Sequence, residues 1–136
     1  MVAHREAIAR AGSIRTKRVY EPASPADSAR FLVERLWPRG LKKESLRLDA
    51  WLREVAPSTE LRRWFGHDPA KWDEFRRRYR AELEAHPDAW RVLLDAARHD
   101  PITLLYSAHD VAHNNAVALQ EYLVEKLRSA ARDQAQ

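Results

Sequence analysis

The spacing of hydrophobic residues changes along the chain and predicts an alternation of strands and helices. Segments rich in β-branched and aromatic residues predict strands at 14–20 and 102–107. The second of these is almost continuously apolar, which is typical of a strand buried on both faces of a parallel sheet. Segment 30–36 fits both helical and strand spacing, and its abrupt end at the WPRG motif favours a strand.

Apolar residues three or four positions apart predict the helices. A first helical stripe spans Leu48 to Glu54, and a second short helix begins at Ser58 and ends at Gly66. Three longer helices are expected from Asp68 to about Ala85, from Pro87 to Arg98, and from Val111 to Ala131. Helices that alternate with buried strands predict an α/β fold with a small, mostly parallel sheet flanked by helices.

The chain has 136 residues, the usual size of one compact domain. Because Gly12 and Ser13 break the chain before the first expected strand, we expect an N-terminal arm over 1–12, one domain over 13–131 and a tail over 132–136. No segment has the length of an apolar membrane helix, and the first dozen residues lack the apolar stretch of a secretory signal. We therefore expect a cytoplasmic protein that does not bind membranes.

Composition and motifs exclude several kinds of chemistry. The chain has no cysteine, which excludes disulfides, iron–sulfur clusters, cysteine-ligated zinc and thiol catalysis. It has only three glycines and contains none of the sequence motifs of classical dinucleotide sites, P-loops or serine-hydrolase elbows. No cofactor is predicted.

The basic residues are only a weak indication of nucleic-acid binding. The formal net charge is +4, and the densest basic cluster is Arg76-Arg77-Arg78 followed by Arg80. However, the surrounding segment 60–84 holds seven basic and six acidic side chains. Nucleic-acid binding needs basic charge that is not neutralised locally, so this pattern favours a solvated helix face of mixed charge.

The candidate site follows from the predicted parallel sheet, because ligands bind beyond the carboxyl ends of such strands. Two loops then become important, the one after 30–36 and the one after 102–107. The candidate ligand-binding residues are Arg35, Trp37, Arg39, Tyr106, Ser107, His109, Asp110, Asn114 and Asn115. Arginine and a helix N-terminus both favour an anionic ligand, such as a phosphate or a carboxylate. His113 is the candidate catalytic residue, as a proton carrier.

Structural roles compete with this interpretation. Arg35 or Arg39 could pair with nearby carboxylates, and Trp37 could belong to the core. Asp110 could cap the last helix, where its charge would repel an anion. His109 and His113 lie four residues apart, as paired metal ligands on a helix do. Because His109 is expected to precede the cap, no metal site is predicted.

Four stretches of this chain together resemble one known family. They are KRVY at 17–20, RFLVERLWPRG at 30–40, WLREVAPSTELRRWFGHDPAKWDEFRRRYRAEL at 51–83 and LLYSAHDVAHNNAVALQEYL at 104–123. The chain from 14 to about 127 resembles the YeaO-like proteins, a branch of the domain-of-unknown-function family 488 that occurs in small bacterial proteins. The resemblance implies a compact α/β domain with a strand at 30–36, and it supplies no catalytic residue. Ser28 and Glu34 stand where the family pattern has Gly and Asp.

Three functions remain open. The first is a protein that binds, and could act on, an anionic small molecule or a nucleotide-like ligand between the two loops. The second is a homodimeric structural or regulatory protein that associates through the aromatic helices at 51–83. The third is a nucleic-acid-binding module, which the many arginines would serve.

Overall fold

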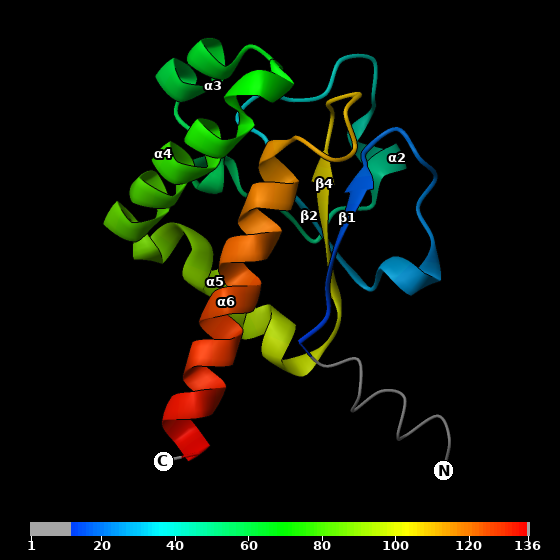
Figure 1. Ribbon diagram of the computed structural model, residues 1–136. Helices are drawn as coiled ribbons and strands as arrows, with labels where there is room; N and C mark the ends of the chain where they lie inside the picture. The colour runs from blue at the N-terminus through cyan, green and yellow to red at the C-terminus, as the bar shows by residue number, and fades with distance from the viewer. Residues whose placement is uncertain (1–11, 136) are drawn as a thin grey trace.

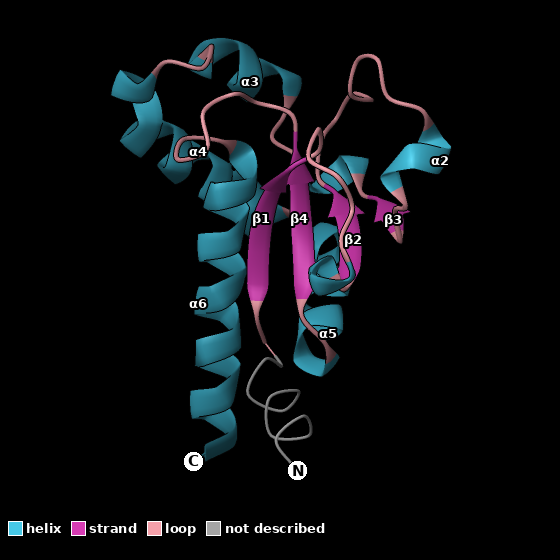
Figure 2. Ribbon diagram, turned by 90° about the vertical axis from the view of Figure 1, so that its right-hand side faces the viewer, coloured by secondary structure: helices cyan, strands magenta, loops and turns pink. Residues whose placement is uncertain are grey.

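A four-stranded parallel sheet forms the centre of the molecule. The computed structural model describes residues 12–135, and its strands are β1 (Ile14–Arg18), β2 (Ala29–Leu32), β3 (Ala50–Trp51) and β4 (Ile102–Tyr106). They are arranged in the order β1-β4-β2-β3, with every neighbouring pair parallel. All strands therefore end at one edge, the carboxyl edge, which points upward in Figure 2. The predicted α/β class is confirmed.

The long helices lie on one side of this sheet. They are α4 (Trp72–Ala85), α5 (Pro87–His99) and α6 (Asn115–Ala135); in Figure 1, α4 and α6 stand to the left of the strands and α5 runs from the left to below them. The short helix α3 (Thr59–Phe65) lies beyond the carboxyl edge. None of the helices in the described part of the chain is long and apolar enough to cross a membrane.

Side chains alternate between two hydrophobic clusters, one on each face of the sheet. On the helical face, Phe31 and Leu104 join a large core with residues of α3 to α6. On the other face, Leu32 and Leu105 pack with Trp37 and with residues near the short helix α2 (Lys43–Leu46). β4 is buried at all five positions, because both faces of this central strand are covered.

One predicted helix is wrong. Within the expected helix from Leu48 to Glu54, Ala50 and Trp51 form β3, and a 3-10 turn follows at Arg53–Val55. The Leu52 amide donates to the Leu32 carbonyl at 2.9 Å, so pairing with the edge of the sheet outweighs the helical spacing of the apolar residues. A stripe this short fits both structures, and only the neighbouring strand decides between them.

Two helix starts and one loop also differ from the prediction, and the strand expected at 30–36 ends at Leu32. The last helix begins at Asn115 rather than Val111, because the carboxylate of Asp110 accepts from the Ala112 and His113 amides and closes a separate turn. The Lys-rich loop contains α2. The expected helix from Asp68 opens with a 3-10 turn before α4 begins at Trp72. The predicted arm lies outside the described residues except at its last position.

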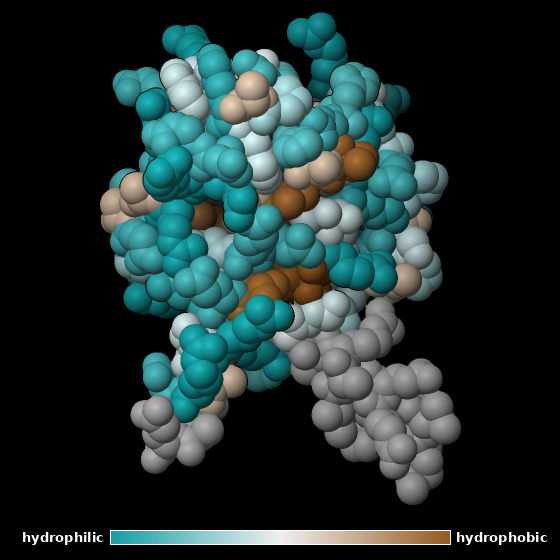
Figure 3. Space-filling model, viewed as in Figure 1, coloured by the Kyte–Doolittle hydropathy of each residue, from teal (hydrophilic) through white to brown (hydrophobic). Residues whose placement is uncertain are grey.

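The aromatic residues that suggested a homodimer are accounted for within one chain. Phe65, Phe75 and Tyr79 are buried in the core, and Trp64 and Trp72 pack against it. The face in Figure 3 is mostly hydrophilic, with apolar surface only in small patches. The homodimer therefore remains a prediction, and the number of aromatic residues no longer supports it.

Candidate functional site

A cavity of about 420 Å³ opens at the carboxyl edge between α3, the end of β4 and the start of α6. This volume is in the range of small-molecule sites. We call it the first cavity. Its polar walls come from four separate segments of the chain and consist of Glu34, Thr59, Arg62, Arg63, His67, Ser107, Asn114 and Asn115. Its apolar wall includes Phe65 and Phe75, which stack at 4.3 Å between ring centroids.

Glu34 is fixed at the base of this cavity by the neighbouring strand. It follows β2, and its Oε1 accepts from the Ser107 amide at 2.8 Å and the Ser107 hydroxyl at 3.1 Å. Burial raises the pKa of Glu34, although the Ser107 donors and the charges of Arg62 and His67 act in the opposite direction. Both bonds go to one carboxylate oxygen, and Oε2 accepts no hydrogen bond from residues 12–135.

The two asparagines tie α6 to the ends of the strands. Asn114 is buried; its Oδ1 accepts from the Val117 amide at 3.0 Å and its Nδ2 donates to the Asp110 carbonyl at 2.9 Å. It is therefore the N-cap of α6, the role that sequence analysis considered for Asp110. Asn115 donates from Nδ2 to the Val33 carbonyl at 2.6 Å. Both side chains line the first cavity while they also hold its walls together.

The positive charge of the first cavity comes from residues that sequence analysis missed. Arg62 and Arg63 lie on α3, and His67 follows it. α3 is capped by Ser58, whose hydroxyl accepts from the Leu61 amide and donates to Glu82 at 2.6 Å. Sequence analysis missed these residues because it did not predict β3. If segment 50–51 is recognised as a parallel strand, the residues that follow it are expected at the carboxyl edge as well.

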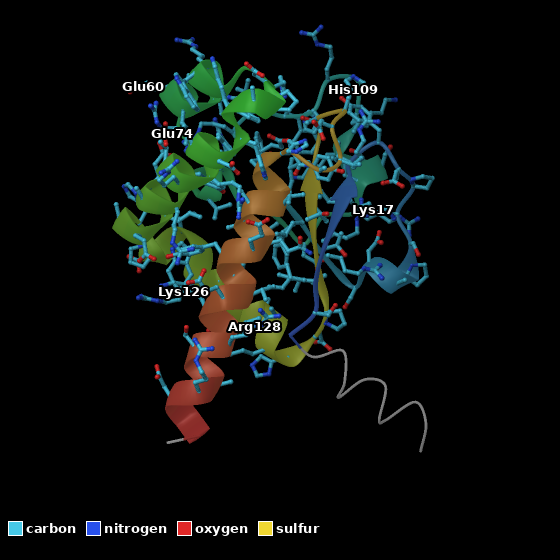
Figure 4. The ribbon with its side chains drawn as sticks, in the orientation of Figure 1. Lys17, Glu60, Glu74, His109, Lys126 and Arg128 are labelled. Atoms are coloured by element: carbon cyan, nitrogen blue, oxygen red, sulfur yellow. The ribbon has the colours of Figure 1, made fainter. Side chains whose placement is uncertain are left out.

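A second cavity of about 530 Å³ adjoins the first. The two cavities share Glu34, Leu36, Arg62 and Ser107. The remainder of the second cavity is lined by Arg18, Tyr20, Trp37, Pro38, Arg39 and His109. His109 is seen at the same end of the molecule as α3 in Figure 4.

Several predicted site residues have mainly structural contacts. Arg35 donates to the Ala56 carbonyl at 2.9 Å and to the Pro57 carbonyl at 3.2 Å, and lines neither cavity. Tyr106 is buried in the core and also lines neither. Trp37 donates to the Leu41 carbonyl at 2.7 Å and packs edge-on against Trp51, so only part of it faces the second cavity.

His113 and Asp110 form a pair beside the first cavity. The Nδ1 of His113 lies 3.0 Å from Oδ2 of Asp110, and the imidazole ring packs edge-on against Trp72 at 5.3 Å between centroids. Bonds from the Ala112 amide and from His113 lower the pKa of Asp110. Neither residue lines either cavity. Among residues 12–135, no group of three or more acidic or histidine side chains is placed to hold a metal ion.

Comparisons with known proteins identify relatives. Over 111 residues the chain is 47% identical to the uncharacterized protein YeaO of Escherichia coli K12, covering 82% of this chain and 96% of the relative. It is 38% identical over 110 residues to the uncharacterized protein Rv3073c of Mycobacterium tuberculosis H37Rv, covering 81% of this chain and 92% of the relative. No solved structure matches. A family model described as the inactive DUF488-N3 subclade matches residues 13–136. The chain therefore belongs to the DUF488 family, in the branch of YeaO-like proteins.

Proposed function

We propose that this protein binds an anionic small molecule or a nucleotide-like ligand in the first cavity. The observation that carries the proposal is the combination of Arg62, Arg63 and His67 on one wall with a fixed, polar floor. Within residues 12–135, the side chains of these three residues form no ion pair and no hydrogen bond. Guanidinium groups without a protein partner are suited to phosphate or carboxylate, which they bind through two parallel hydrogen bonds.

The floor of the cavity supports a ligand that has more than an anionic group. Oε2 of Glu34 has no recorded donor, so a ligand hydroxyl or ring N–H beside the anion could donate to it. The Asn114 and Asn115 side chains are held by the backbone and add rigid polar groups. Phe65 and Phe75 offer an apolar wall to a sugar or a base. A phosphorylated compound with hydroxyl or N–H groups satisfies all three features.

Binding is favoured over catalysis. The carboxylate of Glu34 is tied to Ser107 through two bonds, and the candidate proton carrier His113 lies outside both cavities. The description of the family as inactive is consistent with a binding site that performs no reaction.

Thermal denaturation tests this proposal directly. The wild type is heated with nucleoside monophosphates, sugar phosphates and dicarboxylates, beside Arg63→Gln and a control, Arg91→Gln. Arg91 is an exposed arginine of α5 that pairs with Asp88, away from the carboxyl edge. A compound at one hundred times its dissociation constant stabilises the native state by about 2.7 kcal/mol. We expect a shift in the wild type and in Arg91→Gln that is much smaller in Arg63→Gln.

The same experiment can reject the proposal. It is wrong if no anionic compound in the panel stabilises the wild type, or if Arg63→Gln responds to the active compound as fully as Arg91→Gln does.

A further inference from the structure

The two cavities form one cleft across the carboxyl edge. They share Glu34, Arg62 and Ser107, so these residues stand between two compartments. Arg63 and His67 line the compartment on the α3 side, and Arg39 and His109 line the compartment on the other side. Basic side chains therefore flank a central polar group on both sides. A single phosphate occupies only one compartment, which leaves the other arginines without a role.

Ion pairing separates these arginines from those of α4. On α4, Arg76 lies 2.9 Å from Glu121, Arg77 lies 3.0 Å from Glu74, and Arg80 lies 2.7 Å from Glu125. Within the part of the chain that the structure describes, neither Arg39 nor Arg63 forms an ion pair with a carboxylate. When the cleft is compared with α4, the arginines without an ion pair are those of the cleft, and Glu34 is the only carboxylate among the lining residues.

We propose that the cleft binds a segment of single-stranded nucleic acid, with one phosphate beside Arg62 and Arg63 and the next beside Arg39 and His109. This inference rests on the proposed function, because the first cavity supplies one of the two phosphate positions. Successive phosphates along one strand provide the repeated negative charge that two basic compartments in a row require.

The walls of the second cavity favour an unpaired strand. Tyr20 is 42% exposed and carries the Arg18 guanidinium 5.0 Å above its ring, and Leu36 is 62% exposed. Proteins that bind single strands combine a basic groove with aromatic and arginine surfaces on which bases stack. A base enters a concave cavity only when it is not paired and stacked within a duplex. The shape of the cleft thus favours a single strand over a duplex, in addition to the attraction of its basic residues for phosphate.

Fluorescence anisotropy with a labelled twelve-nucleotide oligothymidylate tests this inference. The variants are Arg39→Gln in the second cavity, Arg63→Gln in the first, and Arg77→Gln on α4 as the control. Arg39 and Arg63 are exposed, and within residues 12–135 neither side chain forms a hydrogen bond, so their replacement should leave the fold intact. We expect each cleft variant to weaken binding about tenfold, the loss of one charged hydrogen-bonding partner. Each variant should also make the plot of log binding constant against log salt concentration less steep, by about 0.7 in slope for each phosphate contact that is lost. Arg77→Gln should bind as the wild type does, and a duplex of the same length should bind more weakly.

Thymidine monophosphate, followed by thermal denaturation, separates this inference from the proposed function. If the monophosphate stabilises the protein through Arg63 while the oligonucleotide binds no tighter and Arg39→Gln has no effect, the extended cleft is wrong and the first cavity remains a small-molecule site. If the oligonucleotide binds but Arg77→Gln weakens it as much as Arg39→Gln does, binding is a general charge effect and the inference is also wrong. If neither compound binds, this inference fails, and the proposed function depends on the other anions of the panel.

Discussion

Two groups of charged residues in this protein behave in opposite ways. On the face of the sheet away from the long helices, Asp27 is 1% exposed and is surrounded by Lys17, Arg30 and the more exposed Arg15. Both oxygens of this carboxylate lie 3.0 Å from the Lys17 ammonium. Figure 4 shows Lys17 on that side of the sheet, below the level of His109 at the carboxyl edge. At the cleft, by contrast, arginines outnumber the single lining carboxylate, Glu34, and form no ion pair with it.

The two groups differ in whether their charged side chains have partners within the protein. Charged residues with such partners hold the fold together, and those without them are the candidates for ligand binding. In the buried cluster, Arg30 also donates to the Leu46 carbonyl at 2.9 Å, and Thr103 donates to the Asp27 carbonyl at 2.7 Å. These bonds join β2, β4 and the segment between β1 and β2. Every charge in the cluster has a partner in the protein, so the cluster positions the chain. Arg62 and Arg63 have no such partner in the described residues, and the proposed function assigns them to a ligand.

The largest effect should come from the buried cluster. Asp27→Asn removes the charge that Arg30 and Lys17 face, and breaking a buried ion pair on one side costs about 3–5 kcal/mol because the other charge stays buried. Urea denaturation of the variant should show a loss of free energy of unfolding of this size. A loss below about 1 kcal/mol, the usual value of an exposed ion pair, would show that this cluster does not stabilise the fold.

A substitution in the cleft should affect ligand binding strongly and the stability of the fold only slightly. Arg62→Gln should change the free energy of unfolding by no more than about 0.5 kcal/mol, as surface substitutions generally do. It should remove most of the stabilisation by a saturating anionic ligand, about 2.7 kcal/mol at one hundred times the dissociation constant. Denaturation with and without the ligand measures both quantities. A strongly destabilised Arg62→Gln would place this arginine with the structural charges.

A smaller effect is expected in the pH dependence of stability. Burial raises the folded-state pKa of Glu34 above its ordinary value of 4.5. The contribution of Glu34 to the free energy of unfolding is therefore complete below the pKa that Glu34 has in the unfolded chain. It is lost as the pH rises through the pKa that Glu34 has in the folded protein. Glu34→Gln keeps an oxygen that can accept from Ser107 and has no titration, so its stability should fall less between pH 4 and pH 8. Parallel profiles for the two proteins would contradict the raised pKa.

The smallest effect should come from charges that are paired but exposed. Arg80 lies on α4 and forms two hydrogen bonds to Glu125 on α6, at 2.8 and 2.7 Å. Because both side chains are about half exposed to solvent, Arg80→Gln should cost less than about 1 kcal/mol and leave ligand binding unchanged. A loss comparable to that of Asp27→Asn would mean that exposure does not separate the two kinds of ion pair.

The sequence predicted much of the fold because its signals are local. The cap at Ser58, the stop at Gly66 and the apolar spacing of α4 and α5 are each contained in a few neighbouring residues. β3 was missed because two residues carry no period of their own, and only their bonds to β2 define the strand. Asn114 was named as a site residue, but its role as the cap of α6 depends on the separate turn that Asp110 closes.

The candidate site was predicted only in part, for the same physical reason. Ser107, Asn114 and Asn115 line the first cavity, and Arg39 and His109 line the second, so the rule that ligands bind at the carboxyl edge led to the end of the sheet at which both cavities lie. Arg62, Arg63 and His67 reach that end only because α3 follows β3. The mixed-charge face expected for the arginine-rich run of α4 agrees with its ion pairs, although the partners of Arg76 and Arg80 on α6 are long-range and cannot be seen in the local sequence.

The most direct test of the central claim is the map of amide chemical-shift changes when thymidine monophosphate is added to the ¹⁵N-labelled protein. The unpaired charges at the carboxyl edge predict changes in segments 34–36, 59–67 and 107–115, and none around Asp27 or along the outer face of α4. Changes that centre on the arginines of α4, or that spread evenly over the basic surface, would contradict the claim that the cleft is the binding site.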